Sequence, residues 1–254
     1  MSTTPVASDL PAPEAQPQAK ISPFGRIIGV LFSPKATFED IVRKPSWVAP
    51  YVLLIITGVI VGVGVDQRVN WRTFISQEIE KSPQAAQLSA DQKERRIEMG
   101  TKIAPYTVYL GTVIVPLIVI VIVAAIMLGA YNLMAGAGVN FRTAFGIVAH
   151  AYVPLAIAHI LFLVVLFLKP PDTLDLNNPV ATNLASFLPE GIPKWLDTMG
   201  KNIDIFVLWI VLLIAVGFRG ANPRRLKGAK PYTIAFGTFI VWIVVRTGLS
   251  FIFS

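Results

Sequence analysis

The stretch MGKNIDIFVLWIVLLIAVGF, residues 199–218, decides how many times this chain crosses a membrane. Its uninterrupted apolar part, Ile205 to Phe218, is short, because a helix needs roughly 20 residues to span a bilayer. The stretch spans only if its helix starts upstream, near Met199, and carries Asp204 into the membrane. We expect that it does, and that it forms the fourth membrane span.

Four further apolar runs surround this stretch. The chain is 54% hydrophobic and 15% charged with a mean hydropathy of +0.63, and its apolar runs are continuous rather than alternating. Only helices or closed barrels satisfy backbone polar groups in hydrocarbon, so these runs predict helices. We therefore predict an all-α integral membrane bundle of five transmembrane helices. Its spans cover about 47–65, 104–134, 144–168, 199–218 and 232–253.

The second run is longer than a bilayer requires and contains Pro105 and Pro116. This predicts either a kink or a helix that starts outside the membrane. Upstream of it, Ser89 in QLSADQKERRIEMG can cap a solvated helix in the first loop, 66–102.

The N-terminal region divides into two parts. Residues 1–20 are rich in Pro and Ala without an apolar run, which predicts a disordered tail. Residues 21–46 contain Ser22-Pro23 and Ser33-Pro34, which are two helix starts, each followed by an amphipathic pattern. Both helices suit the membrane surface with the apolar face down, or pack against the bundle as ordinary amphipathic helices. The predicted interfacial side chains are Phe24, Ile27, Ile28, Leu31, Phe38 and Ile41.

The loop charges bear on orientation. The total Lys and Arg count is almost balanced between the two sides, but loop 219–231 concentrates five basic residues without an acid, whereas the first loop mixes seven with six acids. This favours a cytoplasmic N-terminus and an outside C-terminus. The net charge of +7 thus faces lipid headgroups and does not indicate nucleic acid. The basic residues of the loop are Arg219, Arg224, Arg225, Lys227 and Lys230.

Ionisable residues inside the spans form the candidate site. If the fourth and fifth spans make a hairpin, Asp204 and Arg246 lie level, each about 21 Å from the cytoplasmic edge, with His159 at a similar depth. A charge at such depth is expensive unless it is paired, so we predict an ion pair between Asp204 and Arg246. The alternative is that Asp204 lies at the interface and Arg246 snorkels to the outer headgroups.

The sequence offers little support for catalysis or for a bound cofactor. It has no cysteine, and we find no GxSxG, HExxH or Walker-type motif. His150 and His159 lie near opposite faces of the third span and cannot bind one metal together. We predict no enzyme activity, no cofactor and no metal site.

The segment GAGVN, 136–140, could hold a phosphate but is more typical of a tight turn. Gly58 and Gly62 allow close helix packing, which we expect to be intramolecular.

Four segments resemble the Yip domain, the Ypt/Rab-interacting membrane-protein family, in its bacterial form. LFSPKATFEDIVRKPSWVAPYVLL, 31–54, resembles the start of that domain, and YNLMAGAGVNFRTAFGIVAHAYVPLAI, 131–157, its middle hairpin. DLNNPVATNLASFLP, 175–189, and NIDIFVLWIVLLIAVGF, 202–218, resemble its later loop and fourth helix. The resemblance implies five membrane helices with a cytoplasmic N-terminus. Eukaryotic relatives act in vesicle traffic and contact small GTPases, but their long N-terminal region is reduced here, which leaves a GTPase partner open.

The resulting hypothesis is a non-enzymatic multi-pass protein, in the bacterial inner membrane, that organises or shapes membrane or scaffolds proteins there. Its partners would be the lipid bilayer and other membrane proteins or a second copy of the chain. The alternative is a small transporter or channel, whose pathway would use polar residues in the spans. The residues of this alternative pathway are Asn132, His150, His159, Asp204 and Arg246.

Overall fold

The computed structural model describes residues 20–82, 85–170, 175–176, 178–189 and 191–252, so all but the last residue of the predicted tail lies outside it. Apart from one isolated bridge, the regular structure of this part is helical, which confirms the all-α prediction. The elements are α1 (Pro23–Phe32), α2 (Pro34–Arg43), α3 (Val48–Arg68), α4 (Trp71–Lys81), η1 (Ala85–Gln87), α5 (Ala90–Ala135), α6 (Phe141–Ala151), α7 (Pro154–Leu168), η3 (Leu184–Phe187), α8 (Lys194–Asn202), α9 (Ile205–Ala221) and α10 (Lys230–Ile252).

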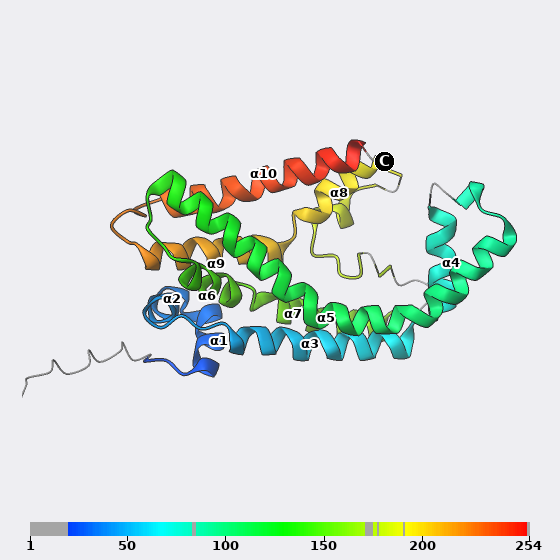
Figure 1. Cartoon of the computed structure of the whole chain (residues 1–254), viewed down its shortest axis with the longest axis horizontal. Helices are drawn as coiled ribbons and strands as arrows, with labels where there is room; N and C mark the ends of the chain where they lie inside the picture. Colours follow the sequence, from blue (N-terminus) through cyan, green and yellow to red (C-terminus); the bar gives the residue numbers. More distant parts are fainter. Residues whose placement is uncertain (1–19, 83–84, 171–174, 177, 190, 253–254) are drawn as a thin grey trace, which may run out of the picture.

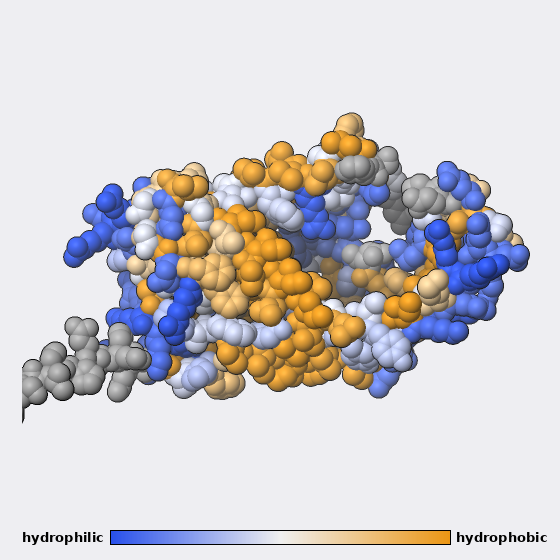
Figure 2. All heavy atoms as spheres, in the orientation of Figure 1, coloured by the Kyte–Doolittle hydropathy of each residue, from blue (hydrophilic) through white to orange (hydrophobic). Residues whose placement is uncertain are grey.

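The long helices run back and forth between two ends of an elongated bundle (Figure 1). Four helical segments are long and apolar enough to cross a membrane: α3, α5, the consecutive pair α6 and α7, and α10. The fifth pass is α9, an apolar helix of 17 residues, which is about 25 Å long and packs along α10. Figure 2 shows an apolar band across the middle of the bundle with polar surface at both ends, as expected for a multi-pass membrane protein.

The fourth pass does not start near Met199. Met199 belongs to α8, and the chain leaves helical geometry at Ile203 before α9 begins at Ile205. The side chain of Asp204 caps α9 by accepting the backbone N–H groups of Phe206, at 2.8 Å, and Val207, at 3.3 Å. A carboxylate satisfies the free N–H groups of a helix start, so Asp204 begins the helix instead of continuing one.

The second pass begins outside the apolar band. Helix α5 runs without a break for 46 residues, about 69 Å, and keeps Pro105 and Pro116 in its interior. Its start is the predicted Ser89 cap, where Ser89 and Gln92 form a capping box. The predicted solvated helix and the second span are therefore one helix, whose first part projects beyond the bundle together with α4 (Figure 1).

The core lies where α9 is enclosed by α2, α6 and α10. Here Tyr131 of α5 stacks on Phe218 of α9 with ring centroids 4.0 Å apart, and its hydroxyl donates to the carbonyl of Pro231 at 2.6 Å. In α3, a Cβ on Gly58 or Gly62 would meet α5 side chains at 3.1 to 3.3 Å. These two glycines thus serve packing within the chain, as expected.

Helix α2 belongs to the core and not to the membrane surface. Phe38 and Ile41 are fully buried and pack within the core cluster that α6 and α9 share. The prediction that these two side chains contact the membrane interface is therefore wrong. The packing alternative holds for α2, because the bundle offers its apolar face a close-packed partner that the lipid boundary would not.

Candidate functional site: the two polar ends of the bundle

The two ends of the bundle differ in charge. We call the end built from α1, α2, turn 136–140 and loop 222–229 the basic end, and the end built from α4, η3 and α8 the cap end. Segments 20–47, 136–143 and 219–231 contain 11 of the 22 Lys and Arg residues and two of the 15 acidic residues. From residue 48 onward, the rest of the chain contains 11 of each. The excess positive charge therefore lies at the basic end.

A buried ion pair fastens α1 to α2 at the basic end. Arg26 Nη2 lies 2.8 Å from Asp40 Oδ2, and both side chains are less than 5% exposed. Arg26 also donates from Nη1 to the Lys44 carbonyl at 3.0 Å and to Ser46 Oγ at 2.7 Å. The guanidinium thus joins both helices to the link that leads into α3.

Asp40 is held in its charged form. Burial alone would raise the pKa of this carboxyl, but the Lys20 backbone N–H at 2.8 Å, together with the hydrogen bond and the charge of Arg26, outweighs it. The pKa of Asp40 is therefore lower than its ordinary value. Since a charged pair in a buried place needs every hydrogen bond it can make, these contacts give the pair one arrangement.

The five basic residues predicted for loop 219–231 are all exposed, although Arg219 belongs to the last turn of α9 and Lys230 begins α10. The loop is anchored by the fully buried Leu226 and by Asn222, whose side-chain amide donates to the carbonyl of Ala137 at 2.8 Å. That contact ties the loop to turn 136–140, in which Gly136 and Gly138 have positive φ. The segment GAGVN is therefore a tight turn that supports the loop.

Helix α1 keeps an apolar face that no part of the described bundle covers. Phe24, Ile28 and Phe32 are 70%, 45% and 81% exposed, while Ile27 and Leu31 are half-buried. The exposed three are spaced four residues apart and so form one stripe along the helix. The interfacial prediction therefore remains a proposal for α1 alone.

At the cap end, Asp204 lies in a local polar network. Its Oδ2 accepts the hydroxyl of Thr182 at 2.5 Å, and its backbone forms an isolated bridge with Asn183. Gly200 lets α8 approach η3 closely, because a Cβ on Gly200 would lie 2.8 Å from the backbone nitrogen of Ala185 in η3. Asp204 thus holds the segment before η3 against the start of α9.

The predicted ion pair between Asp204 and Arg246 is not present among the described residues. Arg246 instead donates from Nη1 to Asn202 Oδ1 at 3.0 Å, two residues before Asp204. Asp204 and Arg246 are thus at nearly the same level along the two helices, as predicted. The carboxylate of Asp204, however, already accepts hydrogen bonds from the start of α9 and from Thr182. Asn202 takes its place as the neighbour of Arg246.

His159 and His150 lie apart from this contact. His159 Nδ1 is 2.8 Å from the Thr57 hydroxyl, between α7 and α3. His150 is fully buried in α6, where its Nδ1 is 2.9 Å from the Gly146 carbonyl. Asn132, the last residue of the transport alternative, closes the turn to Val139 through two hydrogen bonds of 2.9 and 3.0 Å. The predicted cluster of His159, Asp204 and Arg246 is therefore distributed over separate contacts.

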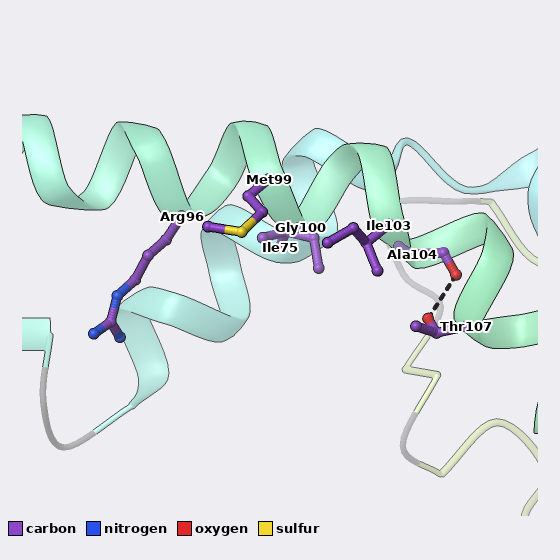
Figure 3. A pocket seen from close by; sticks show the side chains of 7 residues that line it. All are labelled: Ile75, Arg96, Met99, Gly100, Ile103, Ala104 and Thr107. Carbon is purple, nitrogen blue, oxygen red and sulfur yellow. Dashed lines mark hydrogen bonds between the residues drawn. The ribbon is translucent and has the colours of Figure 1, made fainter.

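One open cavity lies between α4 and the projecting part of α5 (Figure 3). It has a volume of about 370 Å³ and a mostly apolar lining with Arg96 at one end. The five polar residues of the transport alternative do not line it. The lining residues are Ile75, Arg96, Met99, Gly100, Ile103, Ala104 and Thr107.

Sequence reasoning missed the Arg26 and Asp40 pair and the Arg246 and Asn202 contact. The members of the first pair are 14 positions apart and belong to two different helices, so no local spacing reveals it. One signal was available, because Arg26 is the only charge among the apolar residues of α1 and Asp40 directly precedes the apolar Ile41. A buried arginine and a nearby carboxylate then suggest each other as partners.

Comparison with known proteins gives one positive result. Residues 28–247, most of the chain, match the Yip1 domain. No curated protein and no solved structure matches significantly. The match begins within α1, two residues after Arg26, and ends within α10, one residue after Arg246. It therefore covers Asp40 of the buried ion pair and both residues of the Arg246 and Asn202 contact. The chain therefore belongs to the Yip1 domain family of multi-pass membrane proteins.

Proposed function

We propose that this Yip1-family protein is a non-enzymatic organiser of the bacterial inner membrane, which acts on the bilayer through its basic end. The observation that carries the proposal is the exposed apolar stripe Phe24, Ile28 and Phe32 on a helix that the bundle holds in place, next to the excess positive charge. Apolar side chains enter the headgroup boundary, and basic residues favour anionic lipids.

The fixed position of α1 matters for this action. An amphipathic helix that is free to leave the surface reports on the membrane, whereas one that is tied to the bundle displaces lipid on one side permanently. The Arg26 and Asp40 pair and the contact of Gly29 with Thr37 tie α1 to α2, and α2 is part of the core. In this proposal the basic end faces the cytoplasm, because basic residues favour that side of a membrane, and so the N-terminus is inside and the C-terminus outside.

The proposal is tested with the full chain in giant vesicles of phosphatidylcholine, with and without phosphatidylglycerol. We expect tubes or buds that depend on the protein and increase with the anionic lipid. Replacement of Phe24 and Phe32 by serine should reduce them several-fold. Phe187→Ser is the matched control, since Phe187 is 76% exposed but lies at the cap end.

The same vesicles test the transport alternative by following entrapped ions and a small dye. Vesicle deformation that is unchanged without Phe24 and Phe32 would contradict the proposal. Transport would be supported instead by a flux that exceeds that of protein-free vesicles and that is abolished by His159→Ala. No described contact joins the polar residues of that alternative into one path, so we expect the flux to equal that of protein-free vesicles.

A further inference from the structure

Arg246 is a cation in an apolar helix, and the described residues satisfy only part of its hydrogen-bonding capacity. Its side chain is exposed, it lies six residues before the end of α10, and Asn202 is its polar partner among the described residues. No acidic side chain of the described residues lies within ion-pair distance of it. An arginine has five N–H donors, so most of them face the surroundings of the protein.

Asn202 fixes how the guanidinium is presented. Asn202 is only 8% exposed, and its amide N–H donates to the Thr198 carbonyl at 2.6 Å, so its oxygen is aimed at Arg246. A second contact between the two helices, from Thr198 Oγ1 to Ser250 Oγ at 2.9 Å, holds α8 along the same side of α10. Arg246 is therefore fastened on its α8 side and open on the other.

The open side of Arg246 is apolar. Trp242 and Leu249 are 51% and 50% exposed, and helix geometry places them about 40° and 60° from Arg246, on the side away from Ser250. Arg246 lies about 9 Å along the helix from Ile252, which is within reach of a headgroup region. The exposed Trp195 of α8, three residues before the Thr198 that contacts Ser250, is an aromatic residue of the kind that favours this level of a bilayer.

We propose that Arg246, positioned by Asn202, binds the phosphate of an anionic phospholipid in the leaflet at the cap end, with an acyl chain along Trp242 and Leu249. Arginine binds phosphate oxygens through two parallel N–H bonds, a geometry that a positioned guanidinium favours. This site lies on the opposite side of the membrane from the basic end. It does not depend on the proposed membrane-shaping function, so either proposal can fail while the other holds.

The test is native mass spectrometry of the full chain, released from nonionic detergent after exchange with equal amounts of phosphatidylglycerol and phosphatidylcholine. We expect the wild type to retain phosphatidylglycerol preferentially. Arg246→Gln should lower this preference about fivefold, which corresponds to about 1 kcal/mol. Arg225→Gln, which removes the same charge at the basic end, should leave it within about twofold of the wild type.

Two further arms complete the test. Arg246→Lys keeps the charge but loses the double hydrogen bond, and it should give a smaller reduction; it also serves if the glutamine variant does not fold. An excess of glycerol phosphate or inorganic phosphate should leave the bound lipid in place. The proposal is overturned by an unchanged preference in both Arg246 variants, by equal losses in Arg246→Gln and Arg225→Gln, or by displacement with a soluble phosphate.

Discussion

Arg26 and Asp40 show why a membrane protein retains an ion pair in a place that water does not reach. Removing two charges from water costs more than their attraction returns unless further hydrogen bonds complete the pair. Here the Lys20 N–H, the Lys44 carbonyl and the Ser46 hydroxyl complete it. The pair therefore defines the arrangement of α1 on α2 more than it stabilises the fold.

Breaking only one side of this pair should be strongly destabilising. Asp40→Ala leaves the Arg26 guanidinium buried without its counter-charge, and we expect a loss of about 3–5 kcal/mol in the free energy of unfolding. Removing both charges together, as Arg26→Met with Asp40→Leu, should cost less than Asp40→Ala alone. Unfolding in mixed micelles measures both variants, and a loss in the double variant that equals or exceeds that of Asp40→Ala would show that the two residues are not coupled.

The pair should also give stability a pH dependence at acid pH. Because the folded-state pKa of Asp40 is below its ordinary value of 3.8, its contribution is fully present above 3.8 and is lost as the pH falls through the lower folded value. The melting temperature of the wild type should therefore approach that of Asp40→Asn on acidification. A difference between the two proteins that stays constant from neutral pH to below 3.8 would contradict this.

At the scale of the helix, the sequence predicts the first residue of a helix well where a single capping residue determines it. Ser22 and Ser89 cap α1 and α5 as expected from local spacing alone. Asp204 carried an equally local signal, because aspartate favours the N-cap, but the need for a span of full length outweighed it. The partner of Arg246 and the burial of Phe38 depend on how distant helices pack, which the pattern within one helix does not contain.

Helix α9 holds the bundle together through a close approach that only glycine permits. A Cβ on Gly217 would overlap the Ile147 side chain of α6 and lie 3.0 Å from the Phe38 ring of α2. Gly217→Ala should therefore lower the free energy of unfolding by about 1–3 kcal/mol. Gly237→Ala in α10 is the control, since a Cβ there would meet no atom within 4 Å apart from its chain neighbours and the nearby backbone of its own helix, and alanine favours a helix. Equal stabilities of the two variants would show that α9 is not packed as described.

At the scale of the whole molecule, the five passes separate two different surfaces. The basic end has 11 Lys and Arg against two acids and leaves the apolar stripe of α1 exposed, whereas the rest of the chain from residue 48 onward balances its charges, and α8 packs on α10 at the cap end. A plain count of Lys and Arg per side is nearly even, so the sequence could favour an orientation only modestly. The difference appears once the acids are counted and α1 and α2 are placed at the same end of the bundle as the loop after α9 (Figure 1).

The number of crossings depends on α9, the shortest pass, and the absence of cysteine from the chain makes a direct test simple. Single cysteines replace Lys35 and Lys227 at the basic end and Lys194 at the cap end, all of which are exposed. In intact bacterial cells an impermeant maleimide should label Lys194→Cys, and should label the other two only after permeabilisation. A helix of about 25 Å crosses only if the bilayer thins or flanking residues reach its surface, as Arg219 and the Asp204 cap allow. If α9 does not cross, Lys227→Cys will react in intact cells together with Lys194→Cys while Lys35→Cys stays protected.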